Sequence, residues 1–250
     1  MHRRLSSGRR WVEQVPGRWC CSRLCLGSKC DFPVDANVRE KVVFVVCRSP
    51  KGGVGTSVVA AALAVQRAAS GHETLLVDLA GDQLALLGIS DRDGLGVGDW
   101  LAAGEDAPVD GLAALERPVA PGLHLLPQGR TVEPDRLTVL AGLLAASQRS
   151  VVVDGGLSTA PLWAAGLATD VVVMRLCYLA LNRAGSLAPT ARVVLIEEPG
   201  RALTASDVSG VLGVPIWRRL ALDPAVARSV DAGVLAQRVP RSLRGLVWDG

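Results

Sequence analysis

Residues 41–57 read KVVFVVCRSPKGGVGTS, an apolar run followed by a glycine-rich turn. Residues 41–47 predict a strand that is buried on both faces, and the alanine-rich residues 58–69 predict a helix. A glycine-rich turn between a strand and a helix directs backbone N–H groups at an anion, and the helix dipole strengthens the attraction. The stretch therefore predicts a phosphate-binding loop.

Each residue of this loop has an expected part in binding phosphate. The glycines supply the torsional freedom that the turn needs. Ser57 stands where a hydroxyl would bind Mg²⁺. The predicted cofactor-binding residues are Lys51, Gly52, Gly53, Val54, Gly55, Thr56 and Ser57.

Strand and helix signals alternate along the rest of the chain. This alternation predicts an α/β fold with a mostly parallel sheet and helices on both faces. In such sheets a ligand lies at the carboxyl ends of the strands. Further strands are predicted at 73–78, 123–126, 151–154, 170–175, 192–196 and 214–220, short helical pieces within 82–116, and helices at 134–147 and 223–232.

Carboxylates follow two of the predicted strands. Asp78 ends the strand at 73–78, and Asp154 ends the strand at 151–154, just before Gly155. A buried carboxylate needs a partner, so an acid at the end of a buried strand such as Asp154 has few structural explanations, of which helix capping is the main one. For Asp82 we expect a structural role, as the N-cap of a helix that starts at Gln83.

The loop resembles the K-G-G-x-G-K-[ST] motif of the ParA/MinD family of deviant-Walker P-loop ATPases, and the resemblance extends over about residues 41–235. It implies a SIMIBI-type P-loop NTPase fold, ATP and Mg²⁺ as cofactors, and a homodimer in which Lys51 reaches the partner's nucleotide. Asp78 matches the first acid of the family's V-D-x-D switch I motif. The two matches imply catalytic roles for Lys51 and for Asp78. Asp154 matches the acid of Walker B, which implies that it holds a Mg²⁺-bound water.

The sequence departs from the family's motifs at several positions. Thr56 replaces the second lysine, and Ala80 replaces the second switch I acid, which orients water in active members. Glu197 and Glu198 stand where an adenine-facing Asn is common. The last strand leads into Ala-Leu-Asp, which ends at Asp223, instead of Pro-x-Asp. We therefore expect ATP to bind weakly or not at all, and we leave hydrolysis open.

The resemblance implies a cytoplasmic protein with a degenerate ATP site that acts in spatial positioning of a septum, a chromosome or a secretion or pilus machine. The septum-site-like and pilus-localisation branch is the most similar, which implies a polar or septal location and a protein partner there. One alternative is a working ATPase, with Lys51 or arginines supplying charge and Asp82 serving for Ala80. Another is a partition protein that binds nonspecific DNA through a basic face, with the candidates Arg218, Arg219, Arg228, Arg241 and Arg244.

Charge separates the first residues from the rest. Residues 1–30 hold seven basic residues and one acid, whereas the remainder holds 20 basic and 23 acidic residues, so the globular part is no polycation. We expect 1–40 to be a disordered basic tail or a misassigned start, with a tether for DNA, lipid or a partner as the alternative, and 41–250 to form the P-loop ATPase-like domain. Cys20, Cys21, Cys25 and Cys30 match no common zinc spacing.

The end of the chain combines basic and apolar residues. Residues 238–248 read RVPRSLRGLVW, which we interpret as a last helix packed on the domain. A membrane-binding helix is the alternative, although the segment is short and contains Pro240. No apolar run in the chain reaches the roughly 18 residues of a membrane span.

Overall fold

The computed structural model describes residues 42–90, 94–104, 107–108, 110–130, 132, 136–157 and 166–248. The chain divides into two units, Met1–Glu40 and Lys41–Gly250, and the description concerns the second. The predictions for the basic tail and for its four cysteines concern residues outside this part.

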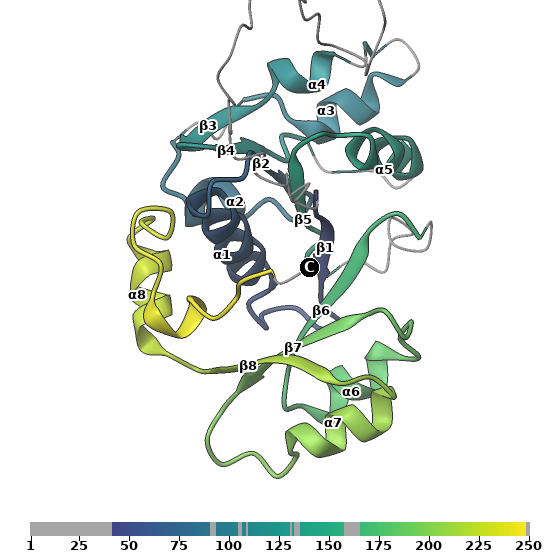
Figure 1. Ribbon diagram of the computed structural model, residues 1–250, viewed down its shortest axis with the longest axis vertical. Coiled ribbons are helices and arrows are strands. Elements are labelled where there is room, and N and C mark those ends of the chain that lie inside the picture. The colour runs from purple at the N-terminus through teal and green to yellow at the C-terminus, as the bar shows by residue number, and fades with distance from the viewer. Residues whose placement is uncertain are drawn as a thin grey trace, which may run out of the picture. The chain divides into compact units, whose positions relative to one another are not determined.

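A single sheet of eight strands forms the centre of the described structure, with the order β3-β4-β2-β5-β1-β6-β7-β8 (Figure 1). All its pairs are parallel except β3 with β4. The seven predicted strands are confirmed, with ends that shift by up to three residues. The strands are β1 (Phe44–Arg48), β2 (Thr74–Asp78), β3 (Arg117–Ala120), β4 (Leu123–Leu126), β5 (Ser150–Asp154), β6 (Thr169–Arg175), β7 (Arg192–Glu197) and β8 (Ile216–Ala221).

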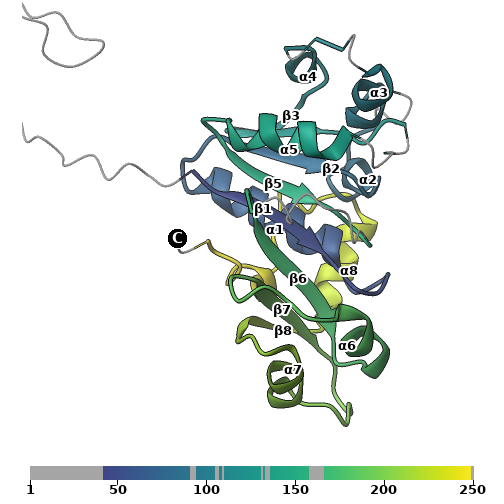
Figure 2. The same cartoon turned by 90° about the vertical axis from the view of Figure 1, so that its right-hand side faces the viewer.

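Helices cover both faces of this sheet, as predicted (Figure 2). One face packs against α1 and the end of the chain, and the other packs against α3, α5, α6 and α7. The helices are α1 (Thr56–Ala69), α2 (Gln83–Leu86), α3 (Val97–Ala102), α4 (Gly111–Ala114), α5 (Leu137–Ala145), α6 (Tyr178–Ala184), α7 (Ala205–Leu212) and α8 (Pro224–Asp231).

The central strands are apolar because they are covered on both sides. Val45, Val152 and Val171 point into the core beneath α1, whereas Val46 and Val153 point into the core beneath α5. Side chains of a strand alternate between the two faces, so a continuous valine run fills both cores. The sheet can therefore present polar groups only where its strands end.

The predicted last helix is wrong. Residues 238–248 contain one turn of 3-10 helix, Arg241–Leu243, and otherwise run irregularly along the domain. Leu243 and Leu246 are buried in the core beneath α1, so the expected packing on the domain is correct. Across the described ranges no helix combines the length and apolar character of a membrane span.

Candidate phosphate-binding site

The glycine-rich loop joins β1 to α1 as predicted. Gly53 and Gly55 have φ values of 74° and 99°, which disfavour any residue with a side chain. The carbonyl of Gly55 accepts the N–H of Val59 at 3.0 Å and so opens α1. The side chain of Val54 is buried in the core, so this residue can take part in the loop only through its backbone.

A cavity of about 880 Å³ opens beside this loop, a volume typical of sites for small molecules. Its walls come from the loop, from the segments that follow β2 and β5, and from the end of β6. The lining residues that matter below are Gly52, Gly53, Gly55, Thr56, Ser57, Ala80, Asp82, Gly156 and Arg175. The glycine-rich loop therefore lines a cavity, as a phosphate-binding loop must.

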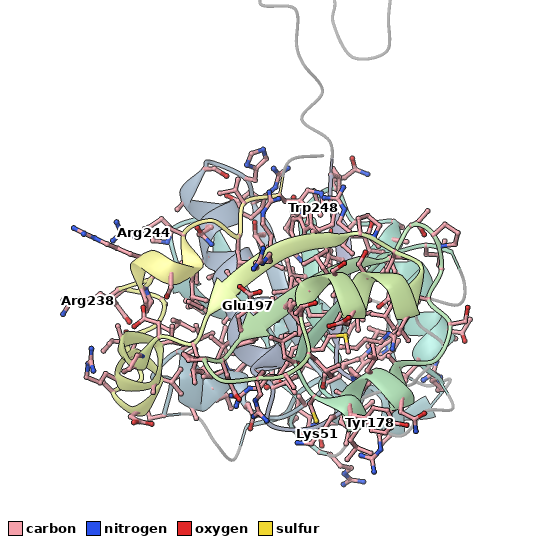
Figure 3. The ribbon with its side chains drawn as sticks, turned by 90° about the horizontal axis from the view of Figure 1, so that it is seen from below. Lys51, Tyr178, Glu197, Arg238, Arg244 and Trp248 are labelled. Atoms are coloured by element: carbon pink, nitrogen blue, oxygen red, sulfur yellow. The ribbon has the colours of Figure 1, made fainter. Side chains whose placement is uncertain are left out.

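Lys51 lies apart from the described lining of this cavity. The pKa of the Cys177 thiol is lowered, mainly by the backbone N–H of Ala180 and more weakly by the charge of Lys51. Lys51 thus lies toward the start of α6, and Figure 3 places it beside Tyr178 at the edge of the domain.

A buried ion pair fixes the strand end from which the loop departs. Arg48 donates to both carboxylate oxygens of Asp170, through Nε at 2.9 Å and Nη2 at 2.7 Å. Asp170 belongs to β6, which pairs with β1. A bidentate guanidinium–carboxylate pair constrains both distance and angle. Arg48 therefore fixes the start of the loop against β6.

Asp78 uses its carboxylate to hold the backbone that follows β2. Its Oδ1 accepts the N–H groups of Ala80 and Gly81 at 2.9 and 2.7 Å, and its Oδ2 accepts the N–H of Gln83 at 3.0 Å. The predicted capping by Asp82 is wrong in detail. Asp82 occupies the N-cap position of α2, but its side chain makes no capping bond among the described residues and instead accepts the Ser57 hydroxyl at 3.3 Å.

Asp154 is held by a neutral amide. The Nε2 of Gln83 donates to Asp154 Oδ2 at 2.8 Å and to the carbonyl of Ser57 at 2.9 Å, while Gly156 donates its N–H to Asp154 Oδ1. Gln83 is fully buried. It ties α2 to the carboxylate of Asp154 and to the backbone of Ser57, the two residues predicted to bind magnesium.

Burial controls the charge of these two acids. Asp78 and Asp154 are opposite each other in the register of β2 and β5. Burial raises the pKa of Asp154 to about 6, the Gln83 hydrogen bond opposes the rise, and the charge of Asp78 adds to it. Burial also raises the pKa of Asp78 above its ordinary value, although its three backbone N–H donors lower it. The site therefore holds two carboxyls that resist ionisation together.

Ion pairs engage the acids near the expected adenine position. Glu197 accepts Arg219 Nε at 2.9 Å, and Glu198 accepts Arg175 Nη1 at 2.6 Å as well as Arg201 Nε at 2.7 Å. Asp223 caps α8 through the N–H of Ala225 and accepts the hydroxyl of Ser242. None of these three acids is among the described lining of the cavity.

Comparison with known proteins agrees with this geometry. The family model described as cellulose biosynthesis protein BcsQ matches residues 43–151, the part that contains the loop and Asp78 but ends before Asp154. No curated protein sequence matches the chain significantly. Among solved structures, a ParA family ATPase from Chlorobium tepidum TLS has 22% identity and a TM-score of 0.66, with 82% of this chain and 96% of that chain covered.

Two septum-site proteins share the same fold. The septum site-determining protein MinD from Pyrococcus horikoshii OT3, solved with Mg-ADP, has 18% identity and a TM-score of 0.68, with 82% of this chain and 94% of that chain covered. MinD in the MinC:MinD complex of Aquifex aeolicus has 17% identity and a TM-score of 0.61 over 77% of this chain and 86% of that chain. This chain has the fold of these ParA and MinD structures.

The residues of this site fit a phosphate group. The loop has the required glycine torsions, its amides precede a helix of 14 residues, and a cavity lies in front of them. Magnesium would be held by the Ser57 hydroxyl and, through water, by Asp154, the pair that the structure brings together. The adenine side fits less well because Glu197 and Glu198 are committed to arginines.

Two side chains of this site could not be predicted from the sequence. Gln83 entered only as the start of a helix, and nothing in its neighbours indicates a contact with Asp154, which is 71 residues away. Arg175 entered only as the end of a predicted strand. A basic residue at the carboxyl end of a parallel strand is the one signal that would have indicated it.

Proposed function

We propose that this chain is a divergent ParA/MinD-type positioning protein whose nucleotide site is weakened. The observation that carries the proposal is a phosphate cavity with intact loop glycines but with Thr56 and Ala80 at the two positions that supply charge in the family. The site keeps Ser57 and Asp154 for Mg²⁺. Because phosphoryl transfer depends on positioning and charge neutralisation, this set favours weak binding and slow turnover.

The proposed role is to place a cellular machine at a septum or pole. Three similarities support it: the septum site-determining protein MinD, the MinC:MinD complex and the BcsQ family model of cellulose biosynthesis. We propose a second copy of the chain as one partner, since Lys51 lies outside its own cavity beside the exposed Tyr178 and Leu179. A protein of the positioned machine is the other partner.

Nucleotide binding by the full chain tests the weakened site. We expect ADP and ATP with Mg²⁺ to bind no tighter than about 100 μM by calorimetry, and Thr56→Lys to tighten binding at least tenfold, because Thr56 lines the cavity and a lysine there adds the missing charge. Thr56→Gln, of similar length but neutral, is the control. Micromolar binding with measurable turnover in the wild type would support the working ATPase instead.

A fluorescent fusion of the full chain in its native cells tests the role. Foci at poles or septa are expected, and a uniform distribution would contradict positioning. This result is independent of the nucleotide measurement, so the two parts of the proposal can fail separately.

A DNA-binding partition protein is the second candidate, and one observation favours it. Arg228, Arg238, Arg241 and Arg244 are exposed, and Figure 3 shows Arg238 and Arg244 projecting from the same side. Of the other two candidates, Arg218 is bonded to backbone carbonyls and Arg219 to Glu197. Binding to random duplex DNA that falls steeply with salt, and that Arg241→Glu with Arg244→Glu abolishes, would select this function.

A further inference from the structure

Strand β6 is longer than its neighbour β1 and carries its last residue to the level of the phosphate loop. The last pair between them is Arg48 with Val172, and β6 continues to Arg175. Three further residues of strand extend roughly 10 Å beyond the end of β1. Arg175 consequently lines the same cavity as Gly52, Gly53 and Thr56.

Arg175 is the one cationic side chain among the described residues that line this cavity, and Asp82 is the one acid. The other basic groups close to the loop are directed elsewhere. Arg48 is committed to Asp170, and Lys51 lies toward α6. The charge that the family places at position 56 therefore has a single available replacement in the described lining.

The guanidinium of Arg175 is anchored at one end and unsatisfied at the other. Its Nη1 donates to Glu198 at 2.6 Å, whereas its Nε is buried without a hydrogen-bond partner among the described residues. A buried donor left unpaired is costly, so an acceptor that reaches it gains that energy. Arg201 also binds Glu198, so this carboxylate is shared between two guanidinium groups.

We infer that Arg175 supplies the phosphate-binding charge that Thr56 does not, and that Glu198 is the positioning residue that holds its guanidinium. The ligand class is a diphosphate or triphosphate chain, held by the loop amides on one side and by the fork of Arg175 on the other. The inference rests on the proposed function only in taking the loop as a phosphate site. It holds whether the ligand is a nucleotide or free pyrophosphate.

Calorimetry on the full chain at constant ionic strength tests this assignment, with pyrophosphate, ADP and ATP as separate probes. We expect Arg175→Ala to weaken pyrophosphate binding about 10- to 100-fold, the loss typical of hydrogen bonds to a charged group. Arg201→Ala is the matched control, because it breaks the other ion pair of Glu198 and does not line the cavity; it should stay within about threefold of wild type. Arg175→Lys should lie between the two.

A second variant separates charge from folding. Adding Thr56→Lys to Arg175→Ala should restore binding, which a misfolded protein cannot do. Equal affinity for all three probes would indicate recognition of phosphate alone, and tighter ADP or ATP binding would indicate a contact with the nucleoside as well. No pyrophosphate binding by the wild type, an unaffected Arg175→Ala, or an equal loss in Arg201→Ala would overturn the inference. None of these results bears on the foci that test the positioning role.

Discussion

Asp154 is a buried carboxyl group whose side-chain partner is the amide of Gln83 rather than a cation. Its pKa is raised to about 6 in the folded protein, from an ordinary value near 3.8. The folded state therefore binds this proton more tightly than the unfolded state does, and stability falls as pH rises through the interval between these values. At neutral pH the ionised carboxylate of Asp154 therefore lowers the stability of the fold, and a bound cation would offset this cost.

Replacing this carboxyl with an amide tests whether its ionisation lowers the stability of the fold. Relative to wild type, Asp154→Asn should gain about 3 kcal/mol of stability between pH 4 and pH 7.5, from two pKa units at about 1.4 kcal/mol each. Denaturant unfolding at several pH values measures this slope. Asp207→Asn is the control with the opposite sign, because Thr204 lowers the pKa of Asp207 and its ionised form stabilises the fold. A slope of zero for Asp154→Asn would contradict the raised pKa.

The residue identities in the site could be predicted only in part. The loop glycines, Ser57 and Asp154 could be proposed from the sequence because they belong to one short motif and to the end of one predicted strand. The occupation of Asp78 by three N–H groups could not be found, since it depends on how the chain turns into α2. The position of Arg175 at the cavity could not be predicted, because it depends on how far β6 extends beyond β1, and that is known only from the register of the two strands.

Two short elements on the same side of the sheet approach each other at their ends. Gly88, just after α2, has a φ of 69°, and a Cβ there would lie 2.2 Å from the carbonyl of Gly233, just after α8. Asp82 from α2 and Val230 from α8 both line the cavity. The two glycines therefore set the spacing of elements that form its wall.

Gly88→Ala should destabilise the protein by at least about 2 kcal/mol more than Gly104→Ala does. Gly104 has nearly the same φ, 71°, with nothing within 4 Å of its added Cβ, so it reports only the backbone strain, about 1 kcal/mol. Thermal and denaturant unfolding of both variants give the difference. Equal losses would show that α2 and α8 can move apart freely.

The elements themselves were largely predictable. The valine-rich runs gave the parallel strands, because continuous apolar sequence needs a sheet covered on both faces. Strand β3 was missed because Arg117–Ala120 is short and contains Pro118. Its signal was the Pro121-Gly122 turn before β4, which joins the two antiparallel strands.

At the scale of the whole domain, the last described residues tie α1 to the edge strand β8. Gln66 of α1 donates Nε2 to the carbonyls of Leu243 and Leu246, and Arg218 of β8 donates to the carbonyl of Gly245. These carbonyls are satisfied by side chains, and Pro240 and Gly245 limit regular structure. A helix was therefore the wrong prediction although the packing was right.

Leu246→Ala should cost about 2–5 kcal/mol, because the side chain is fully buried beneath α1. Val247→Ala, at a position 52% exposed, should change stability by less than about 0.5 kcal/mol. Urea unfolding with tryptophan fluorescence follows both variants, since Trp217 and Trp248 stack edge to face nearby. A small loss of stability for Leu246→Ala would mean that the packing of the last described residues contributes little to the fold.

The ion pair between Arg48 and Asp170 has a consequence for how the protein is made. The two residues are 122 positions apart, so at about 5–20 residues per second the ribosome needs roughly 6 to 24 s to deliver Asp170 after Arg48. During that interval the innermost strand has emerged while β6 is still unmade. The nascent chain then holds the valine-rich strand β1 without the neighbouring strand that covers one of its edges in the folded protein.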